Sequence, residues 1–150
     1  MFQIENNEVN NMIYKTYELY KQKYYETQQR YNAILNEKEK LFALTQPKAV
    51  QFDKERVHGG AASNSFDDYL VKKEQQQIDQ RLSEVKAILE DRERLFKLKE
   101  MELRESTNIQ DKIYTYRYID KMTIEKISLL TSYSRSQTFR ILRTIRNNLK

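Results

Sequence analysis

Six polar side chains near the carboxyl end have the types that read nucleic acid: Arg135, Ser136, Gln137, Arg140, Arg143 and Arg146. An arginine can bond two guanine acceptors at once, a glutamine can do the same for adenine, and a serine can donate or accept. If Thr138, Ile141 or Leu142, Ile145 and Leu149 form the inner stripe of a helix, the polar residues fall on its outer face. We therefore predict base contacts from Arg135, Ser136, Gln137 and Arg140, with Arg135 shared between bases and backbone.

A second set of residues is better suited to phosphates. Thr123 and Lys126 stand at the start of the preceding predicted helix, while Arg143 and Arg146 lie further along the last one. Hydroxyl, ammonium and guanidinium groups in such places hold the DNA backbone and set the register of the protein. We predict that these four side chains bind phosphates.

Three short helices are predicted to position both sets. The first spans 109–119, with Ile113, Tyr116 and Ile119 facing inward, and Asp120–Met122 form a turn. Thr123 is the predicted N-cap of the second helix, which should bury its apolar residues at a spacing of three. Those residues are Ile124, Ile127 and Leu130. After a tight turn at 131–133, Ser134 and Gln137 have the S-x-x-Q form of a capping box for the last helix. The pattern predicts a helix-turn-helix unit over 109–150, whose second helix enters the major groove.

Positive charge is concentrated in the same segment. The chain has a net charge of +5, and residues 111–150 hold nine Lys or Arg against three acids, or +6. The other 110 residues therefore carry −1. A basic surface alone is equally typical of a solvated face, but its coincidence with the helix-turn-helix pattern favours DNA.

The preceding two thirds of the chain contain two heptad stretches. In the first, within 1–45, residues that are mostly apolar or aromatic are spaced alternately by four and three (Ile13, Tyr17, Tyr20, Tyr24, Thr27, Tyr31, Ile34, Lys38 and Leu41). The second, over 66–105, repeats the spacing (Val71, Gln75, Ile78, Leu82, Val85, Leu89, Arg92, Phe96, Lys99 and Leu103), with Ile88 and Leu95 expected to widen the stripe. Two long helices with such seams must pack on each other or on another copy. We predict an all-α fold: a long antiparallel, coiled-coil-like helical hairpin, then the three-helix unit.

A linker is predicted over 46–65, where the sole proline, Pro47, and both glycines, Gly59 and Gly60, occur. The seams do not separate an intramolecular hairpin from a dimeric bundle, and we favour a homo-oligomer formed through the hairpin. The six tyrosines between Tyr14 and Tyr31 could stack on single-stranded bases, but their helical spacing makes a packing seam the better interpretation.

Several classes of protein are not expected. No apolar run reaches the roughly 18 residues of a membrane span, no signal region begins the chain, and mean hydropathy is −0.90. The chain has no cysteine, which agrees with a reducing cytoplasm, and one histidine, His58, without a second His or Cys to share a metal. We expect no catalytic residue, no metal and no cofactor, and hence no enzyme.

The segment RYIDKMTIEKISLLTSYSRSQTFRI resembles region 4 of bacterial sigma factors and related small regulators of phages. With the helical hairpin and the loop VQFDKERVHGG, the chain is similar to phage late transcription regulators of the ArpU-like group. The resemblance implies activation of late genes of a phage or phage-related mobile element, and contact with RNA polymerase. It departs from the family pattern at Ser132, where glycine is usual, and at Ser128, where alanine is usual.

The leading hypothesis is a sequence-specific, double-stranded DNA-binding transcriptional regulator. Two alternatives remain open at this stage. One is an interaction or adaptor protein in which the hairpin does the work and the basic end touches DNA non-specifically. The other is a small terminase-like packaging protein, although such proteins usually carry the DNA-binding unit first.

Overall fold

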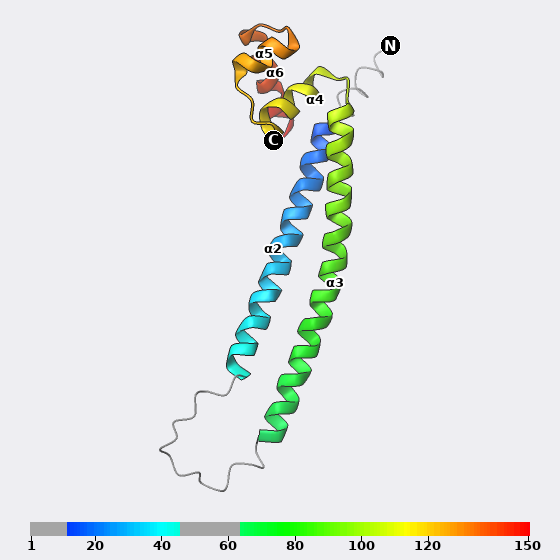
Figure 1. Ribbon diagram of the computed structural model, residues 1–150, viewed down its shortest axis with the longest axis vertical. Coiled ribbons are helices and arrows are strands. Elements are labelled where there is room, and N and C mark those ends of the chain that lie inside the picture. Colours follow the sequence, from blue (N-terminus) through cyan, green and yellow to red (C-terminus); the bar gives the residue numbers. More distant parts are fainter. Residues whose placement is uncertain (1–11, 46–63) are drawn as a thin grey trace, which may run out of the picture. The chain divides into compact units, whose positions relative to one another are not determined.

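The computed structural model describes residues 12–45 and 64–150, and all of its regular structure is helical (Figure 1). The order of elements is α2 (Ile13–Thr45), α3 (Asn64–Glu105), α4 (Ile109–Tyr114), η1 (Thr115–Ile119), α5 (Ile124–Thr131) and α6 (Arg135–Asn148). The predicted all-α class is confirmed. The linker, His58 and the glycine pair lie outside the described residues.

The two long helices contain 33 and 42 residues and no glycine or proline. Their many Glu, Lys, Gln and Leu residues lose little side-chain freedom in a helix, so that nothing interrupts either one. α3 begins at Asn64, two residues before the predicted start, because short polar residues such as Asn and Ser are accepted in a first turn as well as before it.

Contacts divide the chain into two compact units, between which α2 and α3 are shared. The terminal unit contains the start of α2 (12–24) and everything from residue 92 onward, whereas the middle unit spans 25–91. In the terminal unit Tyr17 and Tyr24 both stack on Phe96, at 5.3 and 5.5 Å between ring centroids. In the middle unit Lys38 pairs with Asp79 at 2.7 Å. Earlier residues of α2 thus meet later residues of α3, so the helices are antiparallel.

Every residue of the predicted seam except Lys38 is buried or partly buried. In the middle unit Ile34, Ile78, Leu82 and Val85 form its core. Lys38 is exposed, because its ammonium group extends to the Asp79 carboxylate at the edge of the seam. Ile88 and Leu95 were expected to widen the stripe, and this was wrong: each is 42% exposed. They lie one position before Leu89 and Phe96, about 100° around the helix, and a single neighbouring helix covers only the narrow seam.

The terminal unit has one shared core. Buried residues come from the start of α2, the end of α3 and all three shorter α-helices; they are Met12, Tyr14, Tyr17, Leu103, Ile113, Tyr114, Ile124, Ile127, Leu142 and Ile145. Ile113 is buried as predicted, and Tyr116 and Ile119 pack against this core. The helix over 109–119 changes to a π-helix at Thr115, a widening that the apolar pattern did not indicate.

Candidate nucleic-acid interface

The two helices of the predicted helix-turn-helix, α5 and α6, form where the sequence predicted helices, and their caps explain their sharp boundaries. The Thr123 hydroxyl accepts a hydrogen bond from the Lys126 amide, which begins α5. At the start of α6, Ser134 Oγ accepts from the Gln137 amide at 3.2 Å, and Gln137 Oε1 accepts from the Ser134 amide at 2.9 Å. Both bonds of the predicted capping box are therefore present, and they satisfy amide groups that a helix start otherwise leaves without partners.

The turn between α5 and α6 depends on a left-handed residue. Ser132 has φ 60° and ψ 16°, the conformation that the glycine of the resembling pattern supplies at no steric cost. Ser128 lies half-buried beside Thr138, with 3.3 Å between their hydroxyl oxygens. A small residue at 128 lets α5 approach α6 closely at this point. Ser132 and Ser128 are thus compatible with the tight turn and with the close packing of α5 on α6.

One side of α6 is packed and the opposite side is exposed. Thr138, Leu142 and Ile145 are buried against the rest of the unit, as predicted. Leu149 was expected to join them but is 37% exposed, because it is already the C-cap residue beyond the packed turns. In α5, Ile124 and Ile127 are buried, whereas Leu130 was predicted to be and is 54% exposed. α5 contacts α6 around Ile127 and Ser128 and ends at Thr131, so no element of the described chain covers Leu130.

The exposed side of α6 carries four polar residues in register. Ser136, Arg140, Arg143 and Asn147 are spaced by four, three and four, which places them on one face, about 200° around from the stripe that begins at Thr138. All four are exposed. Asn147 was not singled out from the sequence, although its spacing from Arg143 could have identified it.

Two of the predicted base-reading residues already have partners in this structure. The Arg135 guanidinium pairs with the Glu125 carboxylate of α5 at 3.0 Å. The Gln137 carbonyl oxygen is occupied by the capping box, and a bidentate contact to adenine would require that same oxygen. The side chains of Ser136 and Arg140 form no such ion pair or hydrogen bond within the described part of the chain. The geometry therefore leaves Ser136 and Arg140 as the more available pair.

The remaining cations of this surface are also exposed. Arg140, Arg143, Arg146 and Lys126 form no ion pair with any carboxylate of the residues described. Thr123 is exposed, but its oxygen already accepts from the Lys126 amide. Uncompensated cations on one helix favour contact with an anionic polymer, because neutralising phosphates releases the counterions that surround it.

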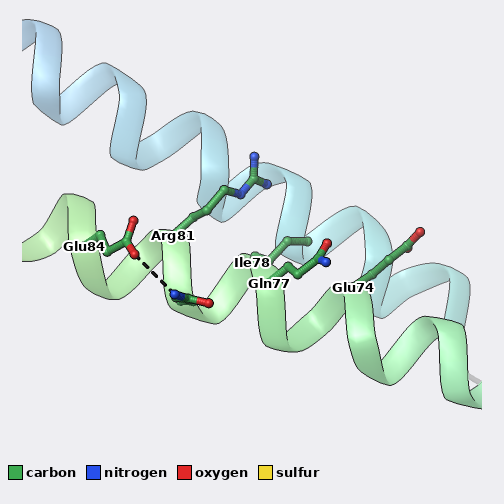
Figure 2. A pocket seen from close by; sticks show the side chains of 6 residues that line it. Glu74, Gln77, Ile78, Arg81 and Glu84 are labelled. Atoms are coloured by element: carbon green, nitrogen blue, oxygen red, sulfur yellow. Dashed lines mark hydrogen bonds between the residues drawn. The ribbon is translucent and has the colours of Figure 1, made fainter.

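Two grooves lined by described residues are alternative candidate sites. A shallow one next to α6 is lined by Glu125, Ser128, Leu129, Ser132, Tyr133, Ser134 and Arg135. The other lies along α3 in the middle unit and is lined by Glu74, Gln77, Ile78, Gln80, Arg81 and Glu84 (Figure 2). Three of its polar side chains have partners: Gln80 donates to Glu84, and Arg81 pairs with Glu37 of α2.

Neither a metal site nor a membrane span was found in the described parts of the chain. Residues 12–45 and 64–150 contain no group of three or more His, Asp or Glu residues placed to hold an ion. Within the same ranges no helix combines the length and the apolar character needed to cross a bilayer.

The clearest feature that the sequence did not indicate is a network around Tyr14 and Tyr114. Tyr114 is fully buried, stacks on Tyr14 at 5.4 Å between centroids, and its hydroxyl donates to Glu18. Burial, followed by the hydrogen bond to Glu18, raises the pKa of the Tyr114 phenol well above its ordinary value. The Asp111 carboxylate accepts from the Tyr14 amide at 3.1 Å, so a residue of α4 caps the start of α2.

The exposed basic face of α6 is thus held by one core that the whole terminal unit shares. Comparison with known proteins adds no relative to this geometry: neither a protein-family model, nor a curated protein, nor a solved structure matches this chain.

Proposed function

We propose that the chain is a sequence-specific, double-stranded DNA-binding regulator of transcription that reads DNA with α6. The observation that carries the proposal is the exposed stripe of Ser136, Arg140, Arg143 and Asn147 on a capped helix whose opposite side is buried. A helix of this kind at the second position of a helix-turn-helix fits the major groove, with its first turns toward the base edges.

The proposed role of each residue follows from whether its side chain already has a partner within the protein. Ser136 and Arg140 read bases, since their side chains are exposed near the start of α6. Arg143, Arg146 and Lys126 bind phosphates and set the register. Arg135 and Gln137 take part in base contact only after leaving Glu125 and the capping box, respectively.

The resemblance to ArpU-like regulators extends the proposal beyond DNA binding. It supplies the class of genes, the late genes of a phage or phage-related element in a bacterial cytoplasm. It also supplies RNA polymerase as a partner and activation as the sign of regulation. The exposed basic face supports the DNA-binding part of this proposal.

Selection of binding sites from random duplexes tests the proposal directly. We expect one enriched motif, bound in the presence of excess competitor DNA. Arg140→Ala should reduce the preference for that motif by about 1–3 kcal/mol, the range for a lost bidentate base contact. The matched control is Arg30→Ala, which removes the same charge from an exposed position of α2 and should leave the preference unchanged.

Two outcomes would contradict the proposal. Uniform, salt-sensitive binding to every duplex, with no enriched motif, would favour the adaptor with non-specific DNA contact. If Arg140→Ala weakened binding equally on all sequences, Arg140 would be a backbone contact and the assignment of base readers would be wrong.

A further inference from the structure

The hydroxyl of Tyr14 joins three elements of the terminal unit. Asn148 Nδ2, in the last turn of α6, donates to Tyr14 Oη at 2.8 Å. Tyr14 Oη in turn donates to Gln110 Oε1 of α4 at 3.1 Å. Contacts between residues 14 and 148 cross almost the whole sequence, so the start of α2 is bonded directly to the helix that carries the basic stripe.

The backbone of the same residue is held as firmly as its side chain. The Tyr14 amide donates to Asp111 Oδ1, while Ser106 Oγ donates to Asp111 Oδ2 at 2.7 Å. Asp111 is buried, and a buried carboxylate is stable only when its oxygens are satisfied in this way. Tyr14 therefore has a single place relative to α4, set by a hydrogen bond at each end of the residue.

Aromatic packing adds a third restraint. The Tyr14 ring is fully buried and lies nearly parallel to Tyr114, with 16° between the planes, and Tyr17 meets Tyr114 edge-on at 5.9 Å. Buried Leu142 and Ile145 of α6 belong to the same core. The packed side of α6 and the start of α2 consequently cannot shift independently, because interiors are close-packed and change volume at a cost.

We propose that Tyr14 is a positioning residue for α6, so that the start of α2 sets the angle at which the basic stripe meets DNA. The inference rests on the proposed function for its consequence in binding, but its structural part does not. The start of α2 is then part of the DNA-recognition unit, and the helix-turn-helix is not an autonomous domain. Anything that displaces the start of α2 changes DNA recognition without touching a DNA-contacting residue.

Hydrogen exchange of the full chain without DNA tests the structural part. Tyr14→Phe keeps the ring and removes both hydroxyl bonds. It should raise amide exchange in the last turn of α6 and its C-cap, residues 145–149, by about fivefold, as expected on losing the partly buried hydrogen bond from Asn148. Exchange in α5 and in the Ile78–Val85 stretch of the middle unit should stay the same. The matched control is Tyr69→Phe, which alters an exposed tyrosine of α3.

Two results would overturn the positioning role. The first is unchanged exchange in α6. The second is a uniform rise through α4, α5 and α6, which would show that Tyr14 only supports the core. The path through Asn148 is tested by combining Tyr14→Phe with Asn148→Ala: effects on exchange that simply add would show that the two residues do not act through each other.

Binding to the selected duplex tests the functional part. Tyr14→Phe should lower the ratio of specific to competitor affinity at least about threefold while leaving the salt dependence unchanged, since no phosphate contact is lost. An unchanged ratio together with raised exchange in α6 would refute control of recognition by Tyr14. Failure of the wild-type chain to select any motif would instead refute the proposed function and leave the exchange result standing.

Discussion

Replacing Glu125 by Gln should strengthen DNA binding, because Glu125 is the acid that holds Arg135. The two side chains pair at 3.0 Å and are 60% and 66% exposed, respectively. An exposed ion pair of this kind contributes about 0.2–1 kcal/mol. Arg135 must give up that energy before it can contact DNA, and the variant removes the cost.

The size of the effect follows from these values. Recovering about 0.2–1 kcal/mol corresponds to a gain of roughly 1.4- to 5-fold in affinity, from the relation of about 1.4 kcal/mol per tenfold change. If the released Arg135 neutralises one more phosphate, the slope of log affinity against log salt also steepens by about 0.9. The free energy of unfolding should fall by no more than about 1 kcal/mol, since only a surface pair is lost.

Fluorescence anisotropy with a selected duplex at several salt concentrations measures both quantities. Glu93→Gln is the matched control: it makes the same change in net charge, and it also breaks an exposed ion pair, that with Lys97 on α3. Its affinity should rise less than that of Glu125→Gln. In the double variant Glu125→Gln/Arg135→Ala the gain should disappear.

The reasoning is refuted if Glu125→Gln binds as the wild type does or more weakly. Equal affinity would mean that Arg135 stays away from DNA even when released. Weaker binding would mean that the Glu125 carboxylate itself contacts the duplex, as an acceptor from cytosine.

Three further predictions concern stability. Ser132→Val should lower the free energy of unfolding in urea by about 1–3 kcal/mol, because a branched residue is strained at φ 60°, whereas Ser132→Gly should not lower it. Raising the pH above about 10, the ordinary pKa of tyrosine, should lower the melting temperature. Burial is the main reason why the phenol pKa values of Tyr14 and Tyr114 are raised in the folded protein. As the pH rises, the unfolded chain therefore loses these protons before the folded protein does. The stability that the two phenols contribute below pH about 10 is lost above it. Ile127→Ala should cost about 2–5 kcal/mol in the same urea assay, because Ile127 is fully buried, and Leu129→Ala less than about 0.5 kcal/mol, because Leu129 is 83% exposed.

Each of these has a distinct contrary result. Equal stability of the Val and Gly variants would show that residue 132 does not require the left-handed conformation. An absorbance titration in which all tyrosines ionise near pH 10 while the helices stay folded would contradict the burial of Tyr14 and Tyr114. A small loss for Ile127→Ala would place that residue outside the core.

Local patterns in the sequence were enough to predict much of the fold. The heptad seams predicted the long helices, because residues three and four apart share a helix face whatever else surrounds them. The capping box of Ser134 and Gln137 was predictable for the same reason, since both of its bonds lie within four consecutive residues. The exposure of Ser136 and Arg140 followed from the buried stripe of the same helix.

Features that depend on which elements meet were decided only by the tertiary structure. Tyr114 and Asp111 are not among the predicted inward positions, and their burial arises because the start of α2 packs on α4, a contact across almost a hundred residues. The exposure of Leu130 and Ile88 has the same origin, because periodicity marks an apolar residue but not whether a neighbour covers it. Arg135 and Gln137 were selected for their chemistry, and the structure showed that Glu125 and the helix cap already engage them. By itself the sequence determined the helices and the polar face of the last one, because these are properties of short segments. The tertiary structure decided which of those polar groups are available, because their partners come from where the chain folds back.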